Sequence, residues 1–306
     1  MWTRARFNKF IVPGYHTATI DSYKNALAAT MYKGMCDIKT SKKAREQTIL
    51  RSGMGDPVVK GEGEPVTFDD QIQGAEQTWV HFVVALAGRI TEEAIEDNLY
   101  ELNNGQDKLK PFFHDIGRSL ANYKETYMAA FLNSGTATTY HTTRNSKALF
   151  ATDHPRLNGT SFSNKLTNTD FTYTSYWAAV VAAENQYDHR QMKITKRVKD
   201  VWYAPQLERK VRETLQSPDR PDTGNRAVNA LAKRGGIAGQ KNWTQLTDTD
   251  AWYLQLDGDG IWQFDRRKTR FARDKDWSTG DLMIKGDQRF SAEIEDPQGW
   301  FGNVPA

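Results

Sequence analysis

The segment RSGMGDPVVKGEGEPVTFDD (Arg51–Asp70) constrains how the rest of this chain can be arranged. It contains four glycines and two prolines, which prevent a helix and leave the segment unable to form a core of its own. Two short extended pieces lie within it, at Val58-Val59 and at Pro65–Phe68. We therefore predict a long two-stranded loop that projects from the body, and a loop of this length is usually functional or disordered.

A strand and a helix are expected directly after this loop. The run TWVHFVVALAG (Thr78–Gly88) is rich in β-branched and aromatic residues and predicts one strand that is buried on both faces. Thr91 is a suitable N-cap for the next helix, because Glu92 and Glu93 follow in the first turn, where the helix dipole favours acidic residues. Asn103-Asn104-Gly105 predicts the end of this helix.

The strongest helical pattern comes next. Apolar residues recur at spacings of three or four, and Pro111 lies in the first turn, where a missing N–H costs little. About 25 residues would give a rod on the order of 38 Å long, which could form the backbone of a domain. The apolar residues of this stripe are Leu109, Phe112, Ile116, Leu120, Tyr123, Tyr127 and Phe131.

The other segments are less regular. Residues 1–25 are mixed in pattern and are interpreted as an arm, with a short helix over Tyr23–Met35. The half of the chain after the long helix is expected to be rich in loops and then in strands. The elements predicted there are a helix from Thr174, a strand over Val198–Ala204, a helix from Pro205, a hairpin that turns at Asp257–Gly260 and returns over Ile261–Phe264, and short strands to Trp300.

Composition places the chain among globular proteins. It has 306 residues, enough for one large domain or two ordinary ones, with 38% hydrophobic and 26% charged residues. The single cysteine, Cys36, excludes an internal disulfide and a cysteine-built metal cluster. The first twenty residues lack the apolar stretch of a signal peptide, and the longest apolar runs are too short to span a bilayer.

Charge is distributed in blocks of opposite sign, although the net charge is only +3. Residues 1–51 carry ten Lys or Arg against three Asp or Glu, and residues 190–234 carry twelve against five, so each block has a net charge of +7. Residues 53–105 carry two against eleven, a net charge of −9. A solvated, salt-bridged surface can have this pattern, and so can a chain whose copies contact one another.

Asp153-His154-Pro155 is the main candidate for chemistry. A catalytic dyad needs a nucleophile and an orienting group, and neither a Gly-x-Ser-x-Gly motif nor a recognisable cysteine signature is present. Pro155 favours extended geometry at His154, and Asn158-Gly159 predicts a turn. We therefore favour a structural turn in which Asp153 accepts local backbone N–H groups, with a catalytic or metal-binding role as the alternative.

Other motifs fail on spacing. The aspartate-rich DTDAWYLQLDGDG (Asp248–Gly260) does not match a calcium-binding EF-hand loop in either register, and a hairpin turn is favoured. RGGIAG (Arg234–Gly239) lacks the Gly-Lys-Ser/Thr ending of a phosphate loop. The basic run Arg190–Asp200 has few aromatic residues, so only a weak, unspecific attraction to a polyanion is expected. The histidines at positions 16, 81, 114, 141 and 189 have no metal-ligand spacing, and no cofactor or metal is predicted.

Four stretches, taken in order, resemble a known family. They are VALAGRITEEAIEDN (Val84–Asn98), ALFATDHPRLNG (Ala148–Gly159) followed by Ser163-Asn164, VWYAPQLERKVRETL (Val201–Leu215), and QLTDTDAWYLQLDGDGIW (Gln245–Trp262) with GWFGNV (Gly299–Val304). Their order and spacing over Thr78–Val304 resemble the major capsid protein of tailed bacteriophages, which has the Hong Kong 97-like fold.

The resemblance implies an α+β fold with an N-terminal arm, an extended β-hairpin loop (the E-loop), a peripheral domain with a long spine helix and a β-sheet, and an axial α/β domain. The expected divisions are 1–45 for the arm and short helix, 46–78 for the E-loop, 79–146 for the peripheral domain, 147–262 for the axial domain and 263–306 for the return to the peripheral domain. Asp153-His154-Pro155 would then be a structural turn near the junction of these domains.

The implied function is that of a major head protein, not an enzyme, which assembles into hexamers and pentamers of an icosahedral shell around the phage double-stranded DNA. The implied partners are other copies of the chain, a portal protein, a scaffolding protein and a decoration protein, with unspecific contact to packaged DNA and no membrane. The segment before the loop is short, which suggests a separate scaffolding protein. The expected location is the virion, after assembly in the host bacterial cytoplasm.

Charge selects the residues expected at contacts between subunits. They are Asp56, Lys60, Glu62, Glu64, Asp69 and Asp70 in the loop, and Arg4, Arg6 and Lys9 in the arm.

Two other functions are weighed against the capsid interpretation. One is a tail-tube or decoration protein, although tube proteins usually lack a long central helix, and the other is a hydrolase that uses His154.

Overall fold

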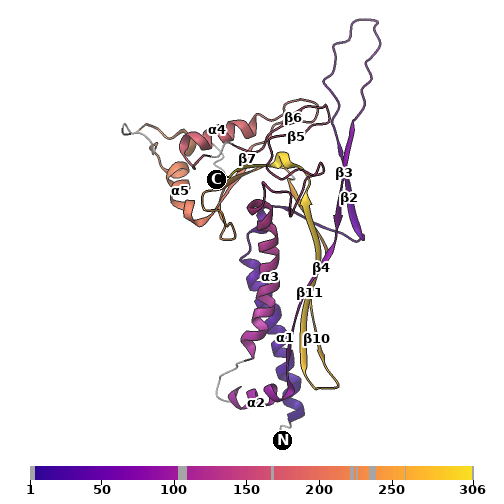
Figure 1. Ribbon diagram of the computed structural model, residues 1–306, viewed down its shortest axis with the longest axis vertical. Coiled ribbons are helices and arrows are strands. Elements are labelled where there is room, and N and C mark those ends of the chain that lie inside the picture. Colours follow the sequence, from indigo (N-terminus) through magenta and orange to yellow (C-terminus); the bar gives the residue numbers. More distant parts are fainter. Residues whose placement is uncertain are drawn as a thin grey trace.

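The molecule consists of an elongated body, a head at the upper end of the body, and a hairpin that projects beyond both (Figure 1). The computed structural model describes residues 4–102, 109–166, 169–220, 224, 227–233, 239–258 and 260–304, without the side chains of 4–13 and 98–102. No helix in these ranges is long and apolar enough to cross a membrane.

The body is a four-stranded sheet with two long helices on one face. Strands β10, β11 and β4 are antiparallel, and β1 pairs with β10 in parallel. The strands, in sheet order, are β1 (Asp37–Thr40), β10 (Ile261–Lys275), β11 (Leu282–Ile294) and β4 (Phe82–Ile90). Helix α3 (Lys110–Asn133) packs on β4 and β11, and α1 (Arg4–Ala28) packs against α3 and contacts β10. Helix α2 (Glu92–Leu102) lies at the far end, close to the start of α1 (Figure 1).

Glycines set the spacing between these layers. A methyl group on Gly88 of β4 would lie 2.6 Å from the Phe112 ring and 2.8 Å from Ile116 of α3. A methyl group on Gly286 of β11 would overlap Leu120 of α3, and one on Gly117 of α3 would overlap the backbone oxygen of Thr19 in α1. The sheet, α3 and α1 can therefore approach one another closely only where a side chain is missing.

The head is built on a second sheet, which is covered on both faces. One face carries Trp202, Tyr253 and Trp300, which join the core around the end of α3, and the other carries Val201, Leu254 and Phe301. This second group packs on helices α4 (Tyr173–Glu184) and α5 (Glu208–Gln216). The strands, in sheet order, are β12 (Trp300–Asn303), β9 (Trp252–Leu256), β7 (Val198–Tyr203) and β8 (Gly239–Asn242). The smaller elements are β5 (His154–Pro155), β6 (Ser161–Phe162), α6 (Ala230–Lys233) and the 3₁₀ turns η1 (Tyr32–Gly34), η2 (Pro205–Leu207) and η3 (Pro297–Gly299).

The predicted projecting loop is confirmed, but the two extended pieces expected within it, Val58-Val59 and Pro65–Phe68, are not strands. Strands β2 (Arg45–Arg51) and β3 (Gln73–Val80) form an antiparallel ribbon, and residues 52–72 continue beyond it without regular strands. In Figure 1 this segment rises above both the body and the head.

The predicted arm is wrong. Residues 4–28 form the long helix α1, and Tyr23–Met35 is not a separate helix but the end of α1 followed by η1. Pro13-Gly14 lies inside α1 and weakens the sequence signal for a helix. Tertiary packing compensates, because the Tyr15 ring stacks on Phe113 of α3 with centroids 4.8 Å apart, and Ser22 Oγ donates to the His114 oxygen over 2.7 Å.

Two strand predictions are also wrong. Thr78–Gly88 is not one strand buried on both faces, since it is divided at His81 between β3 and β4, and the outward side chains of β4 are exposed. Trp252–Leu256 and Ile261–Phe264 do not form a hairpin, because β9 lies in the head sheet and β10 in the body sheet. The expected short strands toward Trp300 are instead the long antiparallel pair of β10 and β11.

Most of the helices match the sequence pattern. The Thr91 side chain accepts the Ala94 N–H over 3.3 Å at the start of α2, and the long helix α3, the helices α4 and α5 and the strand β7 lie where they were expected. The stripe of α3 is shifted, since Phe112 and Tyr123 are partly exposed and Phe113 is fully buried. The predicted helix end at Asn103-Asn104-Gly105 and most of Arg234–Gly239 lie outside the described residues.

Substitution of Gly117 by alanine should destabilise the protein by roughly 1–3 kcal/mol, because the added methyl group meets the backbone of α1. Gly14→Ala is the matched control, since Gly14 is exposed in α1 and a methyl group added there would meet no neighbouring element of the described residues within 4 Å. That control should be stabilising by about 0.5–1 kcal/mol, as expected for glycine in a helix. Urea unfolding followed by circular dichroism would measure both, and equal effects of the two changes would contradict the close helix contact.

Candidate assembly surfaces

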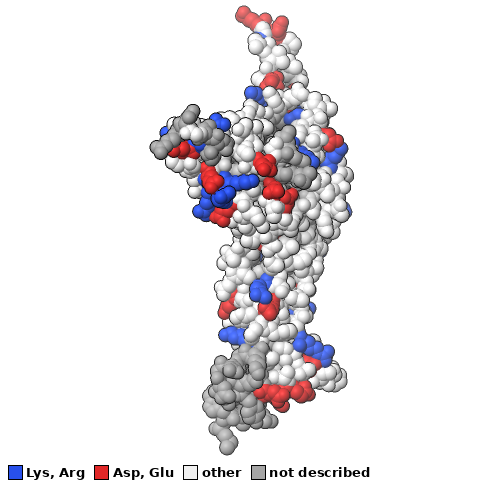
Figure 2. All heavy atoms as spheres, turned by 60° about the vertical axis from the view of Figure 1, so that its left-hand side comes forward, with Lys and Arg blue, Asp and Glu red and all other residues white. Residues whose placement is uncertain are grey.

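The projecting loop exposes both apolar and acidic side chains. Val59 and Phe68 are 95% and 94% exposed, and Met54, Val58 and Val66 are exposed as well. Five carboxylates and one lysine share this segment, and Figure 2 shows acidic side chains at its outer end. The exposed charged residues are Asp56, Lys60, Glu62, Glu64, Asp69 and Asp70. So many exposed apolar groups on one loop are typical of a surface that contacts another molecule.

The predicted contact residues fall into two separate places. Those of the loop lie together, whereas Arg4, Arg6 and Lys9 belong to the beginning of α1 at the opposite end of the molecule (Figure 1). The side chains of these three basic residues are outside the described residues. The fold therefore does not bring the basic start of the chain and the acidic loop together within one copy.

The base of the loop is tied to the head. Ser52 N donates to the Ile72 oxygen over 2.9 Å, and Ile72 N donates to Ser52 Oγ over 2.8 Å. Arg190 forms an ion pair with the Asp69 carboxylate and donates to the Asp70 backbone oxygen over 2.7 Å. The Gly55 N–H and Arg190 together lower the pKa of Asp69 below its ordinary value. Asp69 is therefore engaged by a basic residue of its own chain, which reduces the charge that it can offer to a neighbour.

A buried ion pair fixes the ribbon to the body. Arg144 follows α3 and pairs with Glu295, which lies directly after β11, and both side chains are largely buried. Arg144 also donates to the Thr48 backbone oxygen over 2.9 Å and to Thr48 Oγ1 over 2.8 Å, while Thr48 Oγ1 donates to Glu295 over 2.9 Å. Burial lowers the pKa of Arg144 and raises the pKa of Glu295. The charge of each residue acts against the pKa shift of the other. Neither residue lies in a recognisable motif, so the sequence did not identify this anchor.

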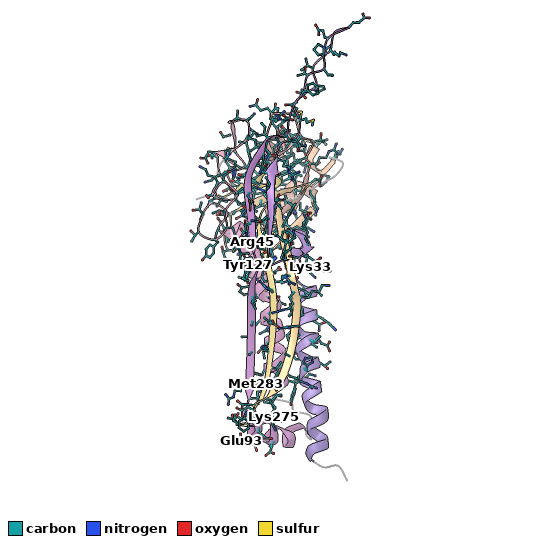
Figure 3. All side chains as sticks on the ribbon, turned by 90° about the vertical axis from the view of Figure 1, so that its right-hand side faces the viewer. Lys33, Arg45, Glu93, Tyr127, Lys275 and Met283 are labelled. Carbon is teal, nitrogen blue, oxygen red and sulfur yellow. The ribbon has the colours of Figure 1, made fainter. Side chains whose placement is uncertain are left out.

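The face of the body sheet that points away from the helices is rich in basic side chains. Figure 3 looks onto this side of the molecule, with Met283 and Lys275 toward its lower end. Asp287 receives Arg270 Nε over 2.7 Å and also pairs with Arg267, and these contacts lower the pKa of Asp287. The outward residues alternate with those that pack on α3. They include Val83, Ala85, Ala87 and Arg89 of β4, Lys285 and Arg289 of β11, and Arg267 and Arg270 of β10.

Asp153 and His154 do not form a dyad. His154 is 2% exposed, its Nε2 faces the Leu149 oxygen at 3.2 Å and Asn164 Oδ1 at 3.0 Å, and its ring stacks on Phe162. Asp153 lies at the surface and pairs with Lys147, and its carboxylate also accepts its own backbone N–H, in agreement with the expected local backbone contact. The turn itself is present, because Arg156 N donates to the Thr160 oxygen over 2.7 Å and Gly159 has a φ of +84°.

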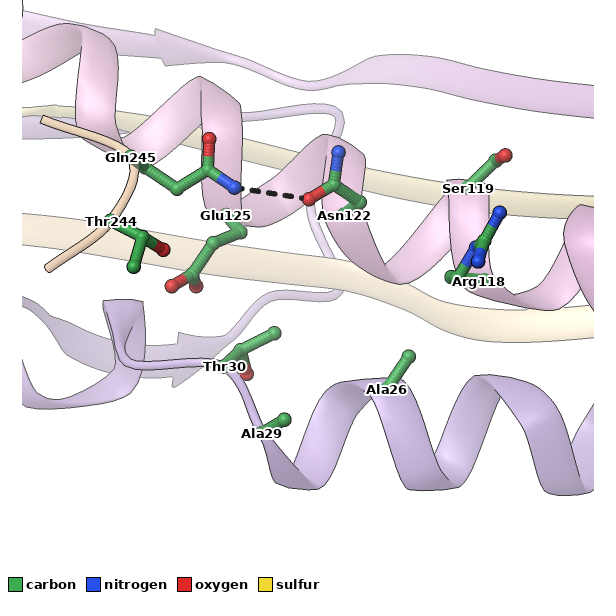
Figure 4. Close-up of a pocket in the computed structure, with 9 residues that line it drawn as sticks. All are labelled: Ala26, Ala29, Thr30, Arg118, Ser119, Asn122, Glu125, Thr244 and Gln245. Atoms are coloured by element: carbon green, nitrogen blue, oxygen red, sulfur yellow. Dashed lines mark hydrogen bonds between the residues drawn. The ribbon is translucent and has the colours of Figure 1, made fainter. Parts of the chain in front are cut away.

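A polar hollow of about 540 Å³ lies between the end of α1 and the middle of α3 (Figure 4). Its buried carboxylate, Glu125, accepts the N–H groups of Met31 and Tyr32 and the Trp243 side-chain N–H, so it stabilises the fold. The Asp248 carboxylate accepts the N–H groups of Asp250 and Ala251, a local turn that the sequence analysis did not predict. Within the described residues, no group of three or more His, Cys, Asp or Glu side chains could hold a metal ion.

Comparison with known proteins identifies the fold. No family model matches the sequence, and no curated protein matches it. Among solved structures, the capsid of the cyanophage P-SCSP1u matches with a TM-score of 0.59 and 12% identity over 91% of this chain and 88% of that chain. A structure from Microbacterium phage Oxtober96 gives 0.57 and 11% over 90% and 91% of the two chains. The capsid of the native GTA particle gives 0.55 and 13% over 90% and 89%.

The chain has a phage capsid fold. This confirms the α+β, capsid-type fold that the sequence resemblance implied. The matches cover about nine tenths of both chains. The finer division into peripheral and axial domains stays a prediction.

Replacement of Arg144 by alanine should destabilise the protein by roughly 3–5 kcal/mol, because the Glu295 carboxylate would remain buried without its partner. Lys147→Ala is the control, since the Lys147–Asp153 pair is exposed and should contribute no more than about 1 kcal/mol. Hydrogen exchange of β2 and β3 should accelerate in the Arg144 variant only. Unchanged protection of this ribbon would show that Arg144 does not anchor it.

Stability should fall as the pH drops below about 6.5. Burial lowers the pKa of His81, of His154 and of His189 below the ordinary value, so the unfolded chain binds protons more readily than the folded one. These histidines contribute their full stabilisation of the folded state above the pKa that they have in the unfolded chain. This stabilisation is lost as the pH falls toward the lower pKa that they have in the folded chain. The raised pKa of Glu295 acts in the opposite sense, so the test compares the parent with His154→Gln. Urea midpoints between pH 8 and 5.5 should show a shallower pH dependence in the variant, and identical slopes would contradict a buried neutral His154.

Proposed function

We propose that this chain is the major capsid protein of a tailed phage, which assembles as hexamers and pentamers into an icosahedral shell around double-stranded DNA. The observation that carries the proposal is the loop at residues 52–72, which is fixed at its base yet exposes Val59 and Phe68 almost completely. Exposure of such apolar side chains to water is unfavourable. In a capsid fold, a neighbouring copy of the chain can provide the surface that covers them.

The outer face of the neighbour's body sheet is the docking surface that we propose for the loop. It carries Lys285 and Arg289 beside the small apolar residues Ala85 and Ala87, and the loop carries carboxylates beside valines. Charge and apolar character are therefore complementary between the two surfaces. A loop of one copy that lies on the sheet of the next makes a heterologous contact, and such contacts can close into rings.

The finer features of the resemblance belong to the same proposal. A portal protein, a scaffolding protein and a decoration protein would be further partners, and Arg4, Arg6 and Lys9 would contact another copy or packaged DNA. The site of action would be the virion, after assembly in the bacterial cytoplasm. No observation favours a tail-tube role, and the buried ring of His154 with its two acceptors does not support a hydrolase.

The test is assembly of the purified chain, observed by negative-stain electron microscopy. The parent should form rings, sheets or shells, and assembly should weaken as salt rises above physiological strength, where the Debye length is about 8 Å. The triple reversal Glu62→Lys, Glu64→Lys and Asp70→Lys should block assembly and leave the circular dichroism of the subunit unchanged. Asp69 is left unchanged because it binds Arg190 within its own chain.

The neutral variant Glu62→Gln, Glu64→Gln and Asp70→Asn is the matched control and should assemble at an intermediate level. If the parent remains a discrete small oligomer under all conditions, the capsid function is wrong. If the parent assembles and the triple reversal assembles equally well, the function stands and the charge-based docking of the loop is wrong.

A further inference from the structure

The projecting loop has few bonds of its own that could fix its direction. Beyond the ribbon of β2 and β3, residues 52–72 form no regular strands. Its backbone–backbone hydrogen bonds are the one from Ser52 N to the Ile72 oxygen and one in a turn, from Glu64 N to the Gly61 oxygen over 3.2 Å. A segment with so few internal bonds takes many directions unless another element holds it.

A turn of the head reaches the loop near its base. This turn, Asp188–Met192, is called the head turn below. Its Arg190 pairs with the Asp69 carboxylate and donates to the Asp70 backbone oxygen over 2.7 Å. The same carboxylate accepts the Gly55 N–H over 2.6 Å from the other arm of the loop. One guanidinium and one carboxylate therefore tie both arms of the loop to the head.

The head turn has a fixed shape. The Asp188 carboxylate accepts the N–H groups of Arg190 and Met192, each over 2.8 Å, and Asp188 N donates to the Met192 oxygen over 2.8 Å. Gln191 has a φ of +69°, which is uncommon for a residue other than glycine. Such a conformation persists only where the surrounding bonds determine it. The turn therefore presents Arg190 in one direction.

Buried side chains attach the head turn to the same support that holds the ribbon. Gln186 Nε2 donates to the Gln298 oxygen over 3.2 Å, and Gln298 Nε2 donates to the Tyr187 oxygen over 3.0 Å. Gln186 and Gln298 are both buried. Gln298 belongs to η3, which begins two residues after Glu295, the buried partner of Arg144. Arg190 and the base of the ribbon are thus mounted on one rigid part of the molecule.

The contacts of Arg190 divide the loop into two parts. Residues 52–55 and 69–72 form a held root, and residues 56–68 form an outer part that carries the exposed Val59 and Phe68. The side chain of Arg190 is only 17% exposed, whereas that of Asp69 is 43% exposed. The guanidinium is therefore largely covered and committed to the loop of its own chain.

We propose that Arg190 is a positioning residue, which fixes the direction in which the outer part of the loop leaves the subunit before any neighbouring copy is present. Arg190 acts through the loop and does not itself contact the neighbour. A loop that already points in one direction loses less conformational freedom when it docks. The expected effect on assembly rests on the proposed capsid function, whereas the direction of the loop is a property of the single subunit.

Distances between two spin labels test the direction of the loop in unassembled subunits. One label is placed at Val66→Cys in the outer part and the other at Lys199→Cys, an exposed position of β7 in the head. The only native cysteine, Cys36, is buried, and this burial raises its pKa, so it should not be labelled. Pulsed electron paramagnetic resonance then reports the distribution of the distance between the two labels.

The doubly labelled parent should give a narrow distribution, and Arg190→Ala should make it at least about twofold broader. Asp69→Asn should broaden it as well, and the two changes together should add nothing further, because both remove the same ion pair. Lys193→Ala is the matched control, since Lys193 is an exposed cation directly after the head turn and should leave the distribution unchanged. An equally narrow distribution in Arg190→Ala would overturn the inference.

Hydrogen exchange shows whether the effect is confined to the loop. In Arg190→Ala the protection of β2 and β3 should remain as in the parent, because the Arg144–Glu295 pair is intact. Faster exchange along these strands would mean that Arg190 holds the whole ribbon, and the assignment to the outer part of the loop would be wrong.

Assembly of the unlabelled chain supplies the last measurement. Arg190→Ala should raise the subunit concentration needed for assembly by at least about fivefold, because the loop must then be ordered during docking. Arg190→Lys, which keeps the charge, should restore most of the loss, and Lys193→Ala should assemble as the parent does. If Arg190→Ala broadens the label distances but assembles normally, the positioning role is wrong and the capsid function stands. If the parent forms no particles, the capsid function fails, and the role of Arg190 in assembly fails with it.

Discussion

Close contact through glycines is the constraint on which the body depends. Gly88 and Gly286 let α3 lie directly on the sheet, and Gly117 lets α1 lie directly on α3. The body is therefore thin, with a core of few layers that extends along its length, and the opposite face of the sheet is covered at its upper end, where Trp79 of β3 packs on Trp262 and Phe264, but is exposed along β4 and β11 farther from the head. A long, thin subunit with one open face leaves much surface relative to its volume, and burial of that surface between copies is the available source of further stability.

The sequence predicted the elements whose signals are local. The spacing of apolar residues identified α3, and the cap at Thr91 identified α2, because both signals come from residues within a few turns. Helix α1 was missed because Pro13-Gly14 interrupts its pattern and its stability comes from Phe113 and His114 on another helix. The expected hairpin at Asp257–Gly260 failed for a related reason, since local alternation cannot show that β9 and β10 belong to different sheets.

The candidate contact surfaces were predicted in part. Glycines, prolines and carboxylates in Arg51–Asp70 identified the loop, because composition alone excludes a core there. The anchors of this loop were not predictable, since Arg144 reaches Thr48 and Glu295 from distant parts of the chain. Arg190 likewise joins the second basic block to Asp69, so the two charge blocks meet within one copy as well as facing outward. Charge counting along the sequence cannot separate these cases, because it does not show which charges are already paired.

Under the proposed assembly function, the firm base and the exposed end of the loop have consequences for how copies associate. The Arg144–Glu295 pair is buried and holds the ribbon before any neighbour is present, so little binding free energy is spent on orienting the loop. Each contact can therefore be small and individually weak, since little of its energy is lost to ordering. Weak contacts that separate and form again allow a growing lattice to correct misplaced subunits, whereas many such contacts together hold the completed assembly.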